Sequence, residues 1–172
     1  MSEERVEVLD GEGRAVAVVT RGALRRGNLR HRAVYVLVVD RHARLLVHRR
    51  AGWKDVYPGR SDVAFGGVVQ AGEGPDETAR RELAEEAGID VPLRRLGGGR
   101  YEDARARVVG DVYLAVSDGP FAFSDGEVVE TAWVELSRVR DWVAQHEVCD
   151  DSVALSLPLL EAEGGRAAGA ER

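Results

Sequence analysis

The stretch "GGVVQAGEGPDETARRELAEEAGI", from Gly66 to Ile89, joins a glycine-rich turn to a densely acidic segment. Pro75 suits the first turn of a helix, and the two acids after it suit the positive end of the helix dipole. Gly88 is a natural C-terminal stop, because glycine adopts the left-handed conformation at low cost. The pattern therefore predicts a helix over residues 76–87.

Three glutamates of this helix, Glu82, Glu85 and Glu86, fall on one face. At about 100° per residue they lie within roughly a third of the circumference. Two carboxylates about 4 Å apart repel by roughly 4 kcal/mol at an effective dielectric constant near 20. Glutamates on a helix usually form a solvated face, but a divalent cation bound by their oxygens would also explain the cluster. The absence of a side chain at Gly67 would let a backbone carbonyl join the ligands.

The rest of the same helix contains a stripe that can pack on a sheet and an arginine that can contact a glutamate. Ala79, Leu83 and Ala87 form a stripe of apolar, mostly small residues that can pack closely on a sheet. Arg81 lies four residues before Glu85, the spacing at which two side chains of a helix meet. We therefore expect Arg81 to orient Glu85.

Short apolar stretches bounded by glycine, aspartate or proline predict the strands. They cover 5–10 and 14–20 as a hairpin, 31–40, 43–50, 63–69, two stretches within 93–116, and 127–136. The stretch 31–40 is almost entirely apolar and should be central in the sheet. Residues 21–28 suit a connector with one helical turn. Two late helices are expected, over 138–147 and 153–163. Ser137 can cap the first, and either Asp151 or Ser152 can cap the second. Pro158 would bend or break the second helix.

Composition excludes several classes of function. The 172-residue chain has a net charge of −6, which argues against binding to nucleic-acid polymers and to anionic membranes. Its longest apolar run, 33–39, is too short to cross a bilayer, and its N-terminus lacks a secretion signal, so we expect the cytoplasm. Cys149 is the single cysteine, which excludes an internal disulfide and favours an inert thiol. The 23 arginines against one lysine suggest a G+C-rich bacterial genome.

The opening stretch resembles a Nudix box, whose pattern is G-x5-E-x7-R-E-(apolar)-x-E-E-x-G-(apolar). All nine defined positions are filled, by Gly67, Glu73, Arg81, Glu82, Leu83, Glu85, Glu86, Gly88 and Ile89. A chance match is on the order of 10⁻⁹ per start position. The flanking strands extend the resemblance over roughly 29–160. They are similar to the branch of the superfamily that contains isopentenyl-diphosphate isomerase and YfcD-like hydrolases.

The resemblance implies an α+β fold, with an α/β/α sandwich around a mixed sheet. It implies a hydrolase of the diphosphate bond in a nucleoside diphosphate linked to a group X, or in a related compound, with Mg²⁺ or Mn²⁺ as cofactor. The partner is then a small-molecule diphosphate, and a homodimer is common in the family. The chain divides into an N-terminal hairpin and connector (1–28), a Nudix domain (29–162, box 67–89) and a tail expected to be disordered (163–172).

The resemblance also assigns roles to residues. The catalytic group comprises Glu82 as general base or metal-bound partner, Arg81 and Glu85. The expected metal ligands are Glu82, Glu85, Glu86, the carbonyl of Gly67 and Glu130. Some Nudix enzymes place the base outside the box, so Glu130 and Glu127 are the alternatives to Glu82. Candidate substrate residues are Arg49, Arg50, Lys54 and Phe65, although for Trp53, Tyr57 and Phe65 we favour packing in the core.

Two other functions fit the pattern less well. A Nudix domain that binds a nucleotide without cleaving it would not need the full set of carboxylates. The isomerase uses a catalytic cysteine and a histidine-rich metal site. Its C-G-H segment aligns with Phe65, Gly66 and Gly67, so that the cysteine and one metal histidine are missing, and Leu24 stands near the place of another. His31 matches a histidine of the isomerase, but a structural role beside the sheet is favoured.

Overall fold

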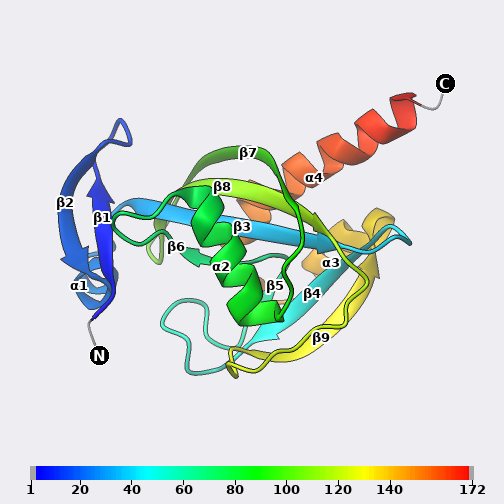
Figure 1. Ribbon diagram of the computed structural model, residues 1–172, viewed down its shortest axis with the longest axis horizontal. Coiled ribbons are helices and arrows are strands. Elements are labelled where there is room, and N and C mark those ends of the chain that lie inside the picture. Colours follow the sequence, from blue (N-terminus) through cyan, green and yellow to red (C-terminus); the bar gives the residue numbers. More distant parts are fainter. Residues whose placement is uncertain (1–2, 171–172) are drawn as a thin grey trace.

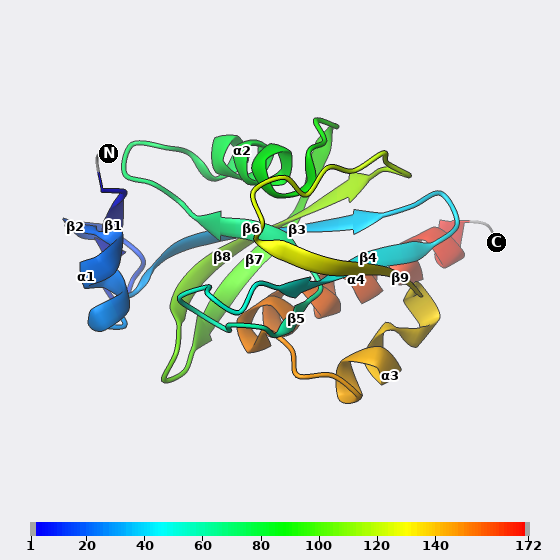
Figure 2. The same ribbon diagram turned by 90° about the horizontal axis from the view of Figure 1, so that it is seen from below.

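The computed structural model of the protein describes residues 3–170. A seven-stranded mixed sheet lies between helix α2 (Pro75–Ala87) on one face and helices α3 (Val139–Ala144) and α4 (Asp150–Ala170) on the other (Figure 1 and Figure 2). The α/β/α sandwich expected from the sequence is thus confirmed. No helix within the described residues has the length and apolar character needed to cross a membrane.

The central strand is β3 (His31–Val39), which is buried along nearly its whole length, as its apolar sequence predicts. It pairs in parallel with β8 (Arg107–Val116) and antiparallel with β4 (Arg44–Arg50) and β6 (Phe65–Val68). The remaining strands of the sheet are β5 (Ser61–Asp62), β7 (Leu93–Glu102) and β9 (Val128–Glu135). Because β6 pairs with the first half of β3, the glycine turn of the box lies against the middle of the molecule.

The N-terminal segment forms the predicted hairpin, β1 (Arg5–Leu9) with β2 (Ala15–Thr20), followed by the short helix α1 (Arg21–Arg26). The Thr20 side chain caps α1 by accepting a hydrogen bond from the Ala23 N–H at 3.2 Å. A small core of Val6, Leu24 and Val68 attaches the segment to β6. This packing carries α1 to the end of the sheet where β6 leads into the box.

Helix α2 has the ends and the packing face that the sequence predicts. It begins at Pro75 and ends at Gly88, whose φ of 68° is left-handed. Ala79, Leu83 and Ala87 are at most 1% exposed and pack against the apolar side chains of the sheet. Burial of this stripe fixes the rotation of the helix, and the carboxylate face is thereby turned toward β6.

The C-terminal part differs from expectation in three respects. Ser137 lies inside a 3-10 turn (Leu136–Arg138) and does not cap α3, which begins after Arg138 without a side-chain cap. Pro158 stands inside α4 without splitting it. Pro158 and Ala154, whose carbonyl loses its partner, are both exposed, so water can replace the missing donor. Helix α4 also continues to Ala170, into the expected disordered tail 163–172, whose last two residues lie outside the described residues.

Candidate active site

Acidic side chains from distant parts of the chain gather beside the glycine turn in a cavity that we call the carboxylate pocket. Glu82, Glu85 and Glu86 enter it from α2, and Glu127 enters it from the loop before β9. The cavity is also lined by Glu4, Arg21, Lys54, Gly66, Gly67, Gln70, Arg81 and Asp125. Helix α2 and strand β6, which contains both glycines, thus bring the three glutamates of the box together with Glu4 and Glu127, which are distant in sequence.

Two glycines make room for these carboxylates. Gly66 has φ 154°, and a Cβ atom there would lie 1.9 Å from the Val34 carbonyl oxygen. Its N–H donates to Oε2 of Glu86 at 3.0 Å. A Cβ atom at Gly67 would lie 2.7 Å from the Glu82 carboxylate carbon. Both positions therefore require glycine, one because of the backbone of β3 and the other because of the carboxylate itself.

Arg81 holds three glutamates at once. Its guanidinium donates to both oxygens of Glu73 at 2.8 and 2.9 Å, to Glu82 at 2.8 Å and to Glu85 at 3.2 Å. Thr78 donates a further hydrogen bond to Glu73 at 2.8 Å. The expected contact between Arg81 and Glu85 is confirmed, and Glu73 gives Arg81 a bidentate anchor that fixes its direction.

The carboxylates of the pocket differ in proton affinity. Burial, followed by the charge of Glu82 and a hydrogen bond with Glu127, raises the pKa of Glu86 well above its ordinary value. Burial also raises the pKa of Glu82. Burial acts in the same direction on Glu127, but the contact and charge of Lys54 outweigh it and lower the pKa of Glu127. The pKa of Glu86 and the pKa of Glu127 are therefore shifted in opposite directions.

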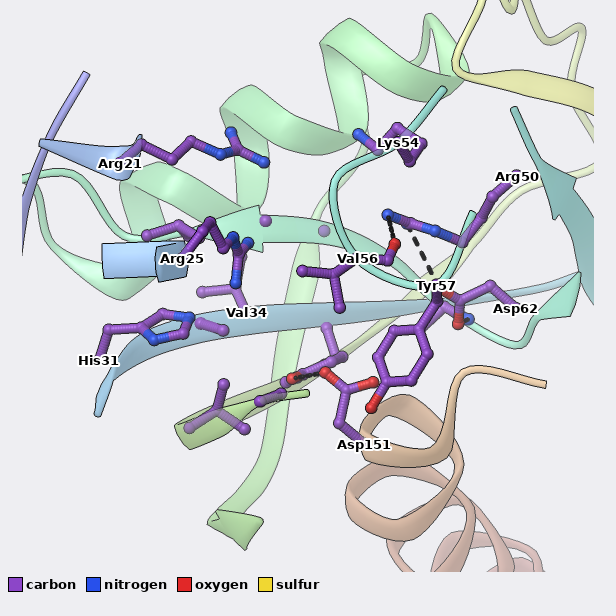
Figure 3. Close-up of a pocket in the computed structure, with 18 residues that line it drawn as sticks. Arg21, Arg25, His31, Val34, Arg50, Lys54, Val56, Tyr57, Asp62 and Asp151 are labelled. Atoms are coloured by element: carbon purple, nitrogen blue, oxygen red, sulfur yellow. Dashed lines mark hydrogen bonds and ion pairs between the residues drawn. The ribbon is translucent and has the colours of Figure 1, made fainter. Parts of the chain in front are cut away.

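A second cavity, which we call the basic pocket, is drawn in Figure 3. It adjoins the first cavity and shares Arg21, Lys54, Gly66 and Gly67 with it. Four cations line it, namely Arg21 and Arg25 from α1, Arg50 from β4 and Lys54 from the following loop. Asp55 accepts hydrogen bonds from Arg21 at 3.3 Å and from Arg25 at 3.1 Å. It is also lined by apolar side chains and by Tyr35, Tyr57, Asp62 and Asp151, a polar group that we call its floor.

The structure brings most of the predicted site residues together. Gly67, Lys54, Arg81, Glu82, Glu85 and Glu86 line the carboxylate pocket, and Arg50 lines the basic pocket. Arg49 and Glu130 line neither cavity. They pair across β4 and β9 at 3.2 Å, with 50% and 69% of their side chains exposed. The expectation that Glu130 binds a metal and that Arg49 meets substrate is not supported. Glu127, three residues earlier and on the other side of the strand, occupies the pocket instead.

The three aromatic candidates, Phe65, Tyr57 and Trp53, differ in burial. Phe65 is 1% exposed and stacks on His48 at 4.4 Å between ring centroids, so it packs in the core and does not line the basic pocket. Tyr57 is buried as expected, but Trp53 is 66% exposed, and the preference for core packing is wrong there. Burial raises the pKa of the Cys149 thiol, which keeps it protonated and agrees with an inert role.

Sequence reasoning missed Arg21, Arg25 and Asp151 as pocket residues. Arg21 and Arg25 stand four apart on α1, a weak signal in a chain with so many arginines. Asp151 was interpreted as a helix cap.

His31 also lines the basic pocket, although it is 2% exposed and Nδ1 lies 2.9 Å from the Leu29 carbonyl. Burial lowers the pKa of His31 to about 4, so the ring is neutral.

A family model described as the NUDIX domain matches residues 29–152. The chain belongs to the Nudix family. It is 43% identical over 139 residues to "Uncharacterized Nudix hydrolase YfcD" of Escherichia coli K12, a match that covers 80% of this chain and 77% of the relative. Family membership and these named relatives make the protein a Nudix hydrolase, an enzyme that acts on acid anhydrides. The Nudix box is the acidic stretch of α2 with its preceding glycine turn.

Solved structures agree on the Nudix fold. The crystal structure of DR0079 from Deinococcus radiodurans has a TM-score of 0.74 at 25% identity, covering 86% of this chain and 94% of that chain. The NUDIX domain of Shewanella oneidensis NrtR, solved in complex with ADP ribose, has a TM-score of 0.58 at 22% identity, covering 78% and 86%. The second likeness shows the fold alone.

Nudix hydrolases generally use divalent metal ions, and the donors of the carboxylate pocket fit such an ion. No three acidic, histidine or cysteine side chains of residues 3–170 are placed to hold a metal as they stand. Glu85, however, has 57% of its side chain exposed, which leaves it free to change rotamer. Carboxylate and carbonyl oxygens are the ligands that a hard cation prefers. A cation would also offset the burial and repulsion that raise the pKa of Glu86.

Proposed function

We propose that this Nudix hydrolase cleaves the diphosphate bond of a nucleoside diphosphate linked to X, or of a related diphosphate, with Mg²⁺ or Mn²⁺ as cofactor. The observation that supports the proposal is the meeting of an acidic and a basic cavity at Gly66 and Gly67. A diphosphate needs positive charge around its oxygens and a carboxylate beside the phosphorus that is attacked. The two adjoining cavities offer both within one substrate length.

Glu85, Glu86 and the carbonyl of Gly67 would hold the ion, with Glu82 as a further ligand if another carboxylate serves as the base. When bound, it supplies positive charge for the phosphate oxygens and acidifies a coordinated water. Glu127 lies in the same pocket, where its contact with Lys54 keeps it ionised and able to support Glu86.

Glu82 is the general base in this proposal. Its carboxylate accepts a hydrogen bond from Arg81 at 2.8 Å and lies against Gly67, so its position is fixed from two sides. Burial raises its pKa, which makes Glu82 a stronger base than an exposed glutamate. Glu82 therefore takes the proton of the attacking water, and Arg81 holds the carboxylate in place as it does so.

Arg21, Arg25, Arg50 and Lys54 bind the phosphates. The two arginines of α1 are fixed by Asp55, so less side-chain freedom is lost when an anion binds. Arg50 is held by Asp62 at 3.7 Å and donates to the Val56 carbonyl at 3.1 Å. The N-terminal segment thus contributes binding groups to the Nudix domain that follows it.

The test is a hydrolysis screen with Mg²⁺ and with Mn²⁺ over sugar nucleotides, dinucleotides, oxidised nucleotides and prenyl or thiamine-type diphosphates. We expect release of a mononucleotide or phosphate from at least one class, and loss of that release with EDTA. Binding without product would favour the silent regulator instead. An allylic isomer formed from isopentenyl diphosphate would favour the isomerase.

A further inference from the structure

The floor of the basic pocket contains a buried hydroxyl that the protein does not satisfy. Tyr57 is 4% exposed, and its hydroxyl makes no hydrogen bond of good geometry with the described residues, although the Asp151 N–H and the Tyr101 side chain lie near it. Leaving a buried polar group unpaired costs about 1–3 kcal/mol. Figure 3 shows the ring directed from the loop between β4 and β5 toward Asp151, with the hydroxyl at its far end. The hydroxyl is therefore available to a ligand in the pocket.

Asp151 lies beside this hydroxyl and is fixed by its neighbours. Oδ2 accepts a hydrogen bond from the Tyr35 hydroxyl at 2.7 Å, and Oδ1 accepts one from the Ser152 N–H at 2.7 Å. Each carboxylate oxygen can accept more than one hydrogen bond, so Asp151 keeps capacity for a further donor. Its position in the first turn of α4 makes it rigid. The floor thus offers a fixed acceptor and an unused hydroxyl, side by side.

Apolar side chains form another part of the lining. Val34, Val56 and Val108 line the cavity together with the four cations and the polar floor. A ligand that reaches from the cations to the floor therefore needs phosphate at one end, a short carbon body and a polar end group. A hydroxyl can donate to Asp151 and accept from Tyr57 at the same time, whereas an ammonium group can only donate.

We propose that the basic pocket selects substrates whose X group is a small hydroxylated carbon skeleton, such as a polyol, with one hydroxyl bound between Tyr57 and Asp151. The inference rests on the proposed function and names the substrate class for the same site. An unsubstituted hydrocarbon group would cover Tyr57 and Asp151 without pairing them, and the site would reject it for that reason.

The experiment compares two substrates that differ only in hydroxyl groups, the adenosine diphosphate esters of glycerol and of n-propanol, hydrolysed with Mg²⁺. We expect the wild-type kcat/KM to favour the glyceryl ester by at least about tenfold. Tyr57→Phe removes only the hydroxyl and should lower this preference about three- to tenfold, through a larger loss for the glyceryl ester than for the propyl ester. The change should appear mainly in KM, because the hydroxyl lies away from the bond that is broken.

Tyr113→Phe is the matched control. The Tyr113 hydroxyl pairs with Asp76 at 2.5 Å and lines neither pocket, so its removal should leave the preference unchanged. Equal hydrolysis of the two esters by the wild type, or an equal loss for both in Tyr57→Phe, would overturn the inference. So would hydrolysis of other nucleoside diphosphates with neither ester cleaved. If no diphosphate of the wider screen is hydrolysed, the proposed function itself fails.

Discussion

The carboxylate pocket and the basic pocket share a glycine wall but are built in opposite ways. The first takes its three central side chains, Glu82, Glu85 and Glu86, from two turns of one helix. The second takes its cations from α1, β4 and the following loop, and Asp151 from α4. The proposed reacting groups are therefore held by one helix, whereas the proposed binding groups are assembled by tertiary packing.

This difference separates the two demands on the site. Chemistry requires a fixed distance between a few carboxylates, and a helix with an arginine anchor supplies it. Recognition depends on the shape of the ligand, and elements far apart in the chain can change it independently. The variants below should accordingly act on turnover in the first pocket and on affinity in the second.

Glu82→Gln should have the largest effect on activity. Removal of a general base typically costs 10²–10⁴ in kcat. The measurement is the initial rate with saturating Mg²⁺, and unfolding temperature serves as the check on folding. Glu77→Gln, an exposed glutamate of the same helix, should retain wild-type turnover. Equal kcat in Glu82→Gln and the wild type would exclude Glu82 as the base.

Glu86→Gln should weaken the response to metal while the fold stays intact. Loss of one charged ligand should move the midpoint of the Mn²⁺ titration upward by about tenfold or more. Activity against Mn²⁺ concentration gives the midpoint, and calorimetry gives the affinity directly. An unchanged titration curve would contradict a ligand role for Glu86.

Arg25→Gln should act on affinity and leave turnover nearly unchanged. A hydrogen bond to a charged group contributes about 1.5–3 kcal/mol, so KM should rise by about tenfold or more. Arg26→Gln is the matched control, because Arg26 follows on the same helix but is exposed and lines neither pocket. A fall in kcat with KM unchanged would contradict a role in substrate binding and would indicate that Arg25 acts in the chemical step.

Asp151→Asn should flatten the pH dependence of stability. Burial raises the pKa of Asp151 from 3.8 to about 6. The folded protein then binds this proton more tightly than the unfolded chain. The contribution to stability is full below about pH 4 and is lost as the pH rises to about 6. The measurement is the free energy of unfolding in urea for wild type and variant at each pH. The difference between the two proteins should change by on the order of 1–3 kcal/mol across this window. Parallel profiles would refute the assignment.

Glu130→Gln should have the smallest effect. Its carboxylate is exposed and pairs with Arg49 across two strands, an arrangement that contributes little to stability or to the site. We expect kcat and KM within about twofold of the wild type. A tenfold loss would show that β9 supplies a catalytic carboxylate after all, and that Glu127 and Glu130 have exchanged roles.

The sequence predicted the carboxylate pocket well because its determinants are local. The spacing of the glutamates, the stripe that packs on the sheet and the contact of Arg81 with Glu85 all follow from helix geometry. The central position of β3 followed from its apolar run. The sequence did not predict which of Glu127 and Glu130 lines the pocket, because this depends on the point at which β9 begins.

The basic pocket could not be predicted in the same way. Arg21 reaches it because Val6 and Leu24 pack on β6, and Asp151 reaches it because α4 begins beneath β3. Neither contact has a signature in the local sequence, where the first residue belongs to a connector and the second suits a helix cap. The sequence could not show that α4 continues past Pro158 for a related reason, since the tolerance of the proline depends on which face of α4 meets solvent.

Gly67 has a practical consequence. A methyl group there would displace the Glu82 carboxylate, because the nearest atoms to it all belong to Glu82. Gly67→Ala should therefore yield a trap, a chain that captures its natural compound from a cell extract and keeps it intact for mass spectrometry.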